Sequence, residues 1–533
     1  MATTIRSYRA ARKASGIFLF LILLVLVISV LTWILTGASQ MVILSGMAVA
    51  LVFLALAIAR DWRSGVYVFI AWLMFEDLSR KYLGNNAFLF FGKDVLAVAT
   101  FLSFLAAKRR RQVVWFRRAP FFPAFAALFG LAAIQVFNPA SPSILYGLLG
   151  LKLYFFYFPL IYIGYALCEN GEDLQRFFLF NLAIGSVVAV LGIVQSIVGL
   201  SFLNPAGMDP ALVDLTSVVR GSAAGGAVPA VSSVFASAGR FSWYIIVLVI
   251  LAMATQAYLL LARRRQALWA GLALAIALVA AMQSGSRGAI MYSVISLIAI
   301  GAAFLWGAPW HWAQGRRLVK AVRRGLLVVA AGLFLMVQVF PQAIGGSWTF
   351  YLDTLSPTSE NSELGSRAWD YPMGNLVAVF QNGHWLLGGG TGTKSLGTQY
   401  VATVLGQPVI IQETGESGFG TLVGEMGIAG LALWLVFSVS LLLQAWKAVK
   451  RTRQTVYFPL AFSIFWYAFL LLLPFTYMAI SPYQNYVMAA YFWILVGMLF
   501  RLPHLEQVRE VAAPRTLRSH AVPGREAVAE LRP

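Results

Sequence analysis

The chain contains 533 residues, of which 60% are hydrophobic and only 11% are charged. Soluble globular proteins are about 45–50% apolar and about 25% charged, so this composition excludes a soluble enzyme. The apolar residues form runs of about 20, the length at which a helix crosses the bilayer, which excludes a disordered protein and an outer-membrane β-barrel. The net charge of +20 does not indicate nucleic-acid binding, because the basic residues lie between the apolar runs and form no single soluble face.

The apolar runs predict an all-α, polytopic helical membrane protein with about 14 transmembrane helices. The predicted spans are residues 16–36, 41–59, 65–82, 93–107, 119–137, 146–167, 177–199, 241–262, 267–283, 289–308, 326–344, 418–444, 456–479 and 486–501. The first run is too long for the core of a signal peptide, so we interpret it as a span. The span at 65–82 is the weakest, because charged residues crowd its end.

The positions of Lys and Arg predict the orientation of the chain. If the N-terminus lies in the cytoplasm, 31 of the 40 Lys and Arg residues fall on the cytoplasmic side. Cytoplasmic loops of membrane proteins are enriched in these residues. We therefore expect both termini to be cytoplasmic.

Residues 1–501 are predicted to form one membrane domain with two long outer loops. The first loop runs from about 201 to 240, and the second, larger loop runs from about 345 to 417, before the last three spans. Loops of this length in a compact protein are usually functional or disordered. The charged segment 502–533 is predicted to be a disordered cytoplasmic tail.

Arg287 is the first candidate for binding an anion. It lies in the sequence Ser284-Gly-Ser-Arg-Gly288, between two predicted spans and on the outer side. A guanidinium is a planar fork of N–H donors that matches phosphate oxygens, and flanking glycines let backbone N–H groups approach the same anion. The alternative is an arginine that extends to the lipid headgroups.

Arg367 is the second candidate and lies in the larger outer loop, in the sequence Gly365-Ser-Arg-Ala-Trp369. The glycine-rich stretch 388–392 follows in the same loop. These glycines either allow a ligand to approach the backbone or form a flexible turn. The alternative role for Arg367 is a cation–π contact with Trp369.

Two carboxylates, Glu413 and Glu416, precede the predicted span 418–444 and are candidates for a general base that acts on a hydroxyl group. They lie three residues apart and share a face if the helix starts early. The alternative is a helix N-terminal carboxylate that the macrodipole stabilises. We favour Glu416 as the catalytic base. Glu425, further along the span, is either functional or bonded to a neighbouring helix.

Other outer polar residues are weaker candidates. Arg240 and Lys152, together with Arg220 and Lys93, are further candidates for binding phosphate, although extension to the headgroups explains Lys152 almost as well. His384 is a further candidate for the base, although we favour a structural role for it. The predicted outer side has no HExxH motif, Cys/His pair or acidic metal cluster, so we expect neither a metal nor another cofactor.

These motifs resemble those of the O-antigen ligase/O-antigen polymerase superfamily of bacterial inner-membrane glycosyltransferases. The similar segments are SGSRGA at 284–289, GSRAWDYP at 365–372, WLLGGGTG at 385–392, ESGFGTLVGEMGIAGL at 416–431 and, more weakly, SSVFASAGRFSWYI at 232–245. In layout the resemblance covers most of the chain, with a core at about 177–445. The ligases begin the fourth segment with His where this chain has Glu416, and this difference favours a polymerase.

The resemblance implies a donor glycan carried on undecaprenyl diphosphate. Arg287 and Arg367, with Arg240 and Lys152, would bind the diphosphate, and Glu416 or Glu413 would act on the hydroxyl of the acceptor glycan. The implied activity is polymerisation of oligosaccharide repeat units into O-antigen or exopolysaccharide at the periplasmic face. A metal-independent reaction is expected because arginines take the place of the metal.

Two alternatives remain open. The first is a ligase that transfers the lipid-linked glycan to a lipid A core or to a protein. The second is a glycan flippase, which is less favoured because the unexplained polar groups gather at one face and not at the bilayer midplane. The implied partners are the lipid bilayer, the donor and the acceptor, with a flippase and a chain-length regulator as candidate partner proteins.

Overall fold

The computed structural model describes most of residues 53–512. The positions inside this range that it does not describe are 55, 86, 111–112, 117–118, 217, 222–226, 308–315, 317–318, 322, 326, 328–329, 332–333, 335–337, 339–348, 357–361, 382, 384 and 407–415. The predicted span 16–36 lies outside the described residues. Of the predicted disordered tail 502–533, residues 502–512 are helical, contrary to the prediction, and residues 513–533 lie outside the described residues. Most of the predicted spans 41–59 and 326–344 also lie outside them.

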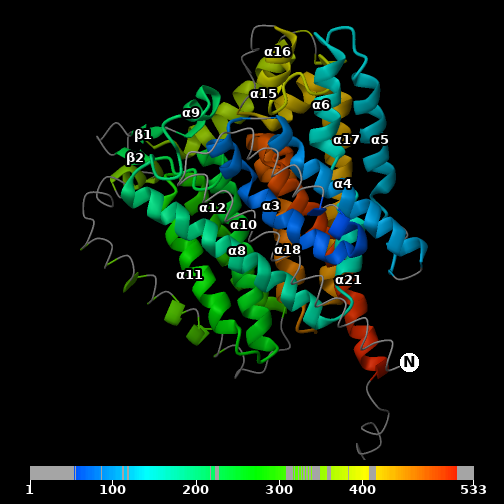
Figure 1. Ribbon diagram of the computed structural model, residues 1–533, viewed down its shortest axis with the longest axis vertical. Helices are drawn as coiled ribbons and strands as arrows, with labels where there is room; N and C mark the ends of the chain where they lie inside the picture. The colour runs from blue at the N-terminus through cyan, green and yellow to red at the C-terminus, as the bar shows by residue number, and fades with distance from the viewer. Residues whose placement is uncertain are drawn as a thin grey trace, which may run out of the picture.

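The described chain is mainly helical with almost no strands, as predicted (Figure 1). The first half contains α3 (Trp62–Leu83), α4 (Ala87–Arg109), α5 (Phe122–Gln135), α6 (Ile144–Phe155), α7 (Leu160–Leu167), α8 (Gly171–Val198), α9 (Pro210–Thr216), α10 (Ala238–Leu261), α11 (Ala267–Gln283) and α12 (Arg287–Gly307). The second half contains the π-helical turn η1 (Ser366–Asp370), α15 (Tyr371–Gln381), α16 (Thr398–Leu405), α17 (Gly418–Arg451), α18 (Phe458–Leu470), the π-helical turn η2 (Leu471–Phe475), α19 (Thr476–Met478), α20 (Ser481–Gln484) and α21 (Tyr486–Ala512). Between α9 and α10, β1 (Val219–Gly221) and β2 (Ala227–Pro229) pair as an antiparallel hairpin.

Eight helices in the described part of the chain are long and apolar enough to cross a membrane. They are Leu89–Arg109, Ile144–Leu167, Gly171–Val198, Ala238–Leu261, Arg287–Trp306, Gly418–Arg451, Phe458–Met478 and Tyr486–Leu505. The prediction of a polytopic all-α membrane protein is confirmed, but the count of about 14 spans is not. The predicted spans at 119–137 and 267–283 correspond to α5 and α11, which have only 14 and 17 residues and fall below the roughly 20 that a span needs.

The central helix of the bundle is α10. It packs against α8, α11, α12 and α18, and nearly all of its residues are buried (Figure 1). A helix that is apolar on every side is buried either among other helices or in lipid, and α10 is surrounded by other helices. Because α9, the β1–β2 hairpin, α15 and α16 gather at one end of this bundle, at the top of Figure 1, the two predicted outer loops meet there.

The predicted span 418–444 corresponds to α17, which is long and apolar enough to cross a membrane and which is kinked at Gly427, where φ is 71°. The kink frees backbone groups that the glycine-rich stretch then satisfies. Gly389 N donates to Gly424 O at 2.8 Å, and Gly390 N donates to Glu425 O at 3.0 Å. A Cβ at Gly388 would overlap the carbonyl of Glu425, so only glycine fits there. The glycines therefore allow the loop backbone to pack directly on α17.

Close packing of α7 against α21 also depends on glycine. A Cβ added at Gly164 would overlap the carbonyl oxygen of Ile494, and one added at Gly497 would overlap that of Ile161. Small residues at such crossings let two helix backbones approach each other.

We expect the substitution Gly164→Ala to destabilise the protein by about 2 kcal/mol, because the added methyl group forces the two helices apart. The matched control is Gly130→Ala in α5, where an added Cβ meets nothing within 4 Å. The control should be neutral or slightly stabilising, since alanine favours the helix. Thermal unfolding in detergent measures both variants, and equal melting temperatures would contradict the prediction.

Candidate functional site

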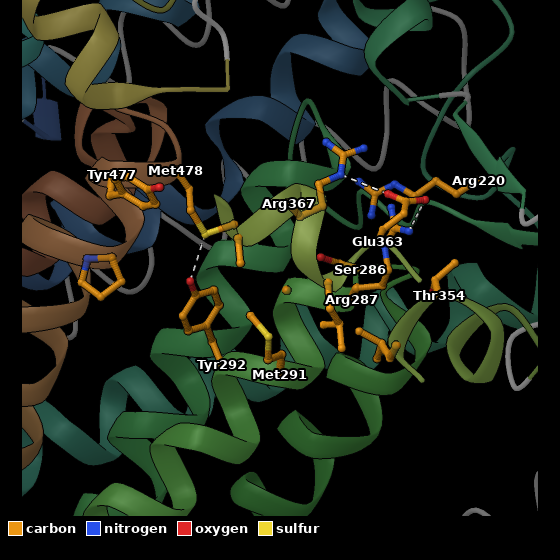
Figure 2. Close-up of a pocket in the computed structure, with 15 residues that line it drawn as sticks. Arg220, Ser286, Arg287, Met291, Tyr292, Thr354, Glu363, Arg367, Tyr477 and Met478 are labelled. Carbon is orange, nitrogen blue, oxygen red and sulfur yellow. Dashed lines mark hydrogen bonds and ion pairs between the residues drawn. The ribbon is translucent and has the colours of Figure 1, made fainter. Parts of the chain in front are cut away.

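A cavity of about 490 Å³ opens at the end of the bundle where the outer loops meet (Figure 2). One wall carries three arginines, which are Arg220, Arg287 and Arg367. The opposite wall is largely apolar and is formed by Met291, Tyr292, Pro474, Tyr477 and Met478. Arg367 lies in η1 and Pro474 lies in η2, so both π-helical turns border the cavity. Such turns occur frequently at functional sites.

The three arginines come from parts of the chain that are far apart in the sequence. Arg220 lies on β1, Arg287 is the first residue of α12, and Arg367 lies in η1. Burial and the neighbouring charge of Arg287 both lower the pKa of the Arg220 guanidinium. Cations held this close to one another favour an anion in the space between them.

The turn before α12 fixes the position of Arg287. Gly285 has φ 67°, and its lack of a side chain lets Pro229 O of β2 approach. Arg220 Nη1 donates to Gly285 O at 2.7 Å, and this hydrogen bond joins the β1–β2 hairpin to the turn before α12. Ser286 Oγ then accepts from Ala289 N at 3.3 Å and caps α12. The positive end of the α12 dipole therefore borders the cavity beside Arg287.

Glu363 joins two of the arginines and is the main residue that sequence reasoning missed. Its Oε1 lies 2.6 Å from Arg287 Nη1, and its Oε2 accepts from Arg367 Nε at 3.1 Å (Figure 2). Burial alone would raise the pKa of this carboxyl, but the two guanidinium groups outweigh that effect and hold the pKa below its ordinary value. The only signal in the sequence is its position four residues before Arg367, a spacing that places two side chains together on a helix.

Glu416, the favoured catalytic base, is ion-paired with Nη1 of Arg367, which lines the cavity. Its side chain is about half exposed, at 48%. The next residue, Ser417, caps α17 by accepting from Gly420 N at 3.1 Å, which fixes the chain at this point. The other candidate bases, Glu413 and His384, lie outside the described residues.

Arg240 and Lys152, the other two predicted phosphate ligands, do not lie at this cavity. Arg240 Nη1 is 2.6 Å from Asp77 Oδ2, and Lys152 is ion-paired with Asp94. They belong to a separate charge cluster built by α3, α4, α6 and α10. The structure therefore brings Arg287, Arg367 and Glu416 together, adds Arg220, and gives Arg240 and Lys152 carboxylate partners elsewhere.

Glu425 is fully buried and bonded to neighbouring elements. Its Oε1 accepts from Lys394 N at 2.9 Å and from Ser395 Oγ at 2.7 Å. Its Oε2 accepts from Tyr154 OH at 3.0 Å. Of its two predicted roles, the structure shows the one in which the carboxylate binds neighbouring segments, because it links α17 to α6 and to the glycine-rich loop.

The sequence matches no protein-family model and no curated protein. Among the residues that the structure describes, no group of three or more His, Cys, Asp or Glu side chains could hold a metal ion. The proposal of a function therefore depends on the chemistry of the residues that line the cavity.

Proposed function

We propose that this protein is a membrane glycosyltransferase that polymerises undecaprenyl-diphosphate-linked repeat units at the periplasmic face of a bacterial inner membrane. The observation that carries the proposal is the cavity with three arginines on one wall and an apolar surface opposite them. Guanidinium groups suit phosphate oxygens, and an apolar wall suits a hydrocarbon chain. A prenyl diphosphate has both of these parts.

The cavity suits the chemistry of transfer from such a donor. A hydroxyl of the acceptor glycan attacks the anomeric carbon of the donor sugar, and the bond from that carbon to the diphosphate oxygen breaks. Undecaprenyl diphosphate leaves with the electron pair, and Arg287, Arg367 and Arg220 stabilise its negative charge. Glu416 takes the proton of the attacking hydroxyl, and its ion pair with Arg367, one of the proposed phosphate ligands, supports this role.

The resemblance to the O-antigen ligase/polymerase superfamily supports the same assignment. Its two key arginines correspond to Arg287 and Arg367, which the structure brings to one cavity. We favour polymerisation over ligation because Glu416 stands where the ligases have His. The proposal includes cytoplasmic termini, a flippase that delivers the substrate, and a chain-length regulator as a partner.

The test is to delete the gene in its native host and to measure the size of the undecaprenyl-linked glycans that accumulate. If the protein is a polymerase, the deletion strain should accumulate single lipid-linked repeat units that a periplasmic glycosidase can reach. Complementation with the wild-type gene should restore long chains, whereas Glu416→Gln should lower their production by about 10²–10⁴-fold, because it lacks the proton acceptor.

Other outcomes identify the alternatives. Long lipid-linked chains that are not transferred to their final acceptor would indicate a ligase. Repeat units that the periplasmic glycosidase cannot reach would indicate a flippase. A lipid-linked glycan profile equal to that of the wild type would reject the proposal.

A further inference from the structure

The Glu363 carboxylate lies between two guanidinium groups in the same way as one phosphate group would. One of its oxygens pairs with Arg287 at 2.6 Å and the other with Arg367 at 3.1 Å (Figure 2). Carboxylates and phosphates both offer arginine two acceptor oxygens that bear negative charge. The site that suits an anionic ligand is therefore already filled by an anion of the protein.

We propose that Glu363 is a built-in competitor for the phosphate site: its carboxylate occupies the place between Arg287 and Arg367 where a phosphate group of the substrate binds, and the substrate displaces it. This inference rests on the proposed function in one respect, namely that these arginines receive the diphosphate of the donor. Glu363 then controls how tightly the site binds the donor and the diphosphate product.

The arginines are held in place by contacts that do not involve Glu363. The Arg287 guanidinium lies over the ring of Phe350, with 5.2 Å to its centroid, and that of Arg367 lies over the ring of Tyr371 at 5.2 Å. Arg367 is also paired with Glu416. Cation–π contacts of this kind fix the position of a guanidinium and leave its N–H edge available. Both arginines can therefore keep their positions when the carboxylate leaves.

The Glu363 side chain can move while its backbone stays fixed. Glu363 N donates to Thr354 O at 3.2 Å, and Glu363 O accepts from Arg367 N at 2.9 Å. The side chain itself is about one-third exposed, at 34%, so water can solvate the carboxylate once it is displaced. Rotation about its side-chain bonds is therefore enough to vacate the site.

Glu363 affects the site both before the donor binds and after transfer. In the empty site it neutralises part of the repulsion among Arg220, Arg287 and Arg367. After transfer it can return to the arginines and replace the diphosphate of the product. Removal of the competitor should therefore tighten binding of donor and product alike, which lowers KM and also lowers kcat where product release limits the rate.

The test compares the wild type with Glu363→Gln, using the full chain in detergent and farnesyl diphosphate as the probe. Glutamine has nearly the same shape but lacks the charge, so the variant should bind the probe about tenfold more tightly. The matched control is Asp370→Asn, which removes an exposed carboxylate at the end of η1. If the effect comes from the arginine site and not from overall charge, the control should stay within about twofold of the wild type.

A second measurement distinguishes tighter probe binding from a change in the stability of the fold. Without the probe, Glu363→Gln should melt at a lower temperature, because the arginines lose their counter-ion. The rise in melting temperature at saturating probe should then exceed that of the wild type, because a ligand that binds more tightly stabilises the folded state more.

Three results would overturn the inference. They are unchanged or weaker binding by Glu363→Gln, an equal gain by Asp370→Asn, and a kcat and KM for Glu363→Gln that both equal those of the wild type. The failure of the proposed function is a separate result. The wild type could transfer no glycan while Glu363→Gln still bound the probe more tightly. That result would support the competition by Glu363 and reject the proposed glycosyltransferase activity.

Discussion

Replacement of Arg287 by alanine is expected to lower glycan transfer by about 10³-fold or more, while the protein still inserts into the membrane. Arg287 begins α12 and borders the cavity. In the proposed reaction its guanidinium stabilises the charge of the departing diphosphate. Arg287→Lys should show intermediate activity, because an ammonium keeps the charge but loses the planar fork. The measurement is the rate at which lipid-linked repeat units are consumed in membranes that contain equal amounts of each variant.

The control for this experiment is Arg176→Ala on α8. Arg176 is 64% exposed and lies 3.8 Å from Glu172 in a surface pair, which contributes little to stability. We expect this variant to retain full activity. Full activity in Arg287→Ala as well would rule out the arginine cavity as the site of transfer.

Replacement of Asp77 by asparagine is expected to destabilise the protein by about 3–5 kcal/mol, because it leaves buried charges without their counter-ion. Asp77 is completely buried in α3. Its Oδ1 accepts from Arg80 Nη1 at 3.0 Å, and its Oδ2 accepts from Arg240 Nη1 at 2.6 Å and from Ala236 N at 3.0 Å. Asparagine has nearly the same shape but no charge, so the loss would reflect electrostatics and hydrogen bonding more than packing.

Thermal or denaturant unfolding of the purified protein measures this effect. The control is Glu172→Gln, which alters a carboxylate that is 73% exposed, and it should change the free energy of unfolding by less than about 0.5 kcal/mol. Equal stability of Asp77→Asn and the wild type would show that the cluster does not depend on this carboxylate.

The separate charge cluster shows where sequence reasoning succeeded and where it could not. The sequence selected Arg287 and Arg367 by their glycine-containing motifs, and Arg240 and Lys152 more weakly, as outer cations. The structure separates them into two pairs. Arg287 and Arg367 border a cavity, whereas Arg240 and Lys152 are paired with carboxylates of α3 and α4. No local pattern in the sequence indicates the carboxylate partners of Arg240 and Lys152.

The glycine-rich stretch and Glu363 illustrate the same limit. The glycine-rich stretch 388–392 predicts an unusual backbone path, but only the kink at Gly427 explains why that path lies against α17. Glu363 carries a local signal for its contact with Arg367. Its contact with Arg287 depends on α12 and the outer loop meeting in space.

The sequence by itself determined that this chain is a helical membrane protein, because long apolar runs must satisfy every backbone hydrogen bond internally within the bilayer. It also singled out the turn at Arg287 and the loop at Arg367. Only the tertiary structure decided which charges are paired and which face a cavity. The physical reason is that the partners of a charge are set by contacts between distant segments, such as Asp77 with Arg240, 163 residues apart, while hydropathy and spacing describe only neighbours along the chain.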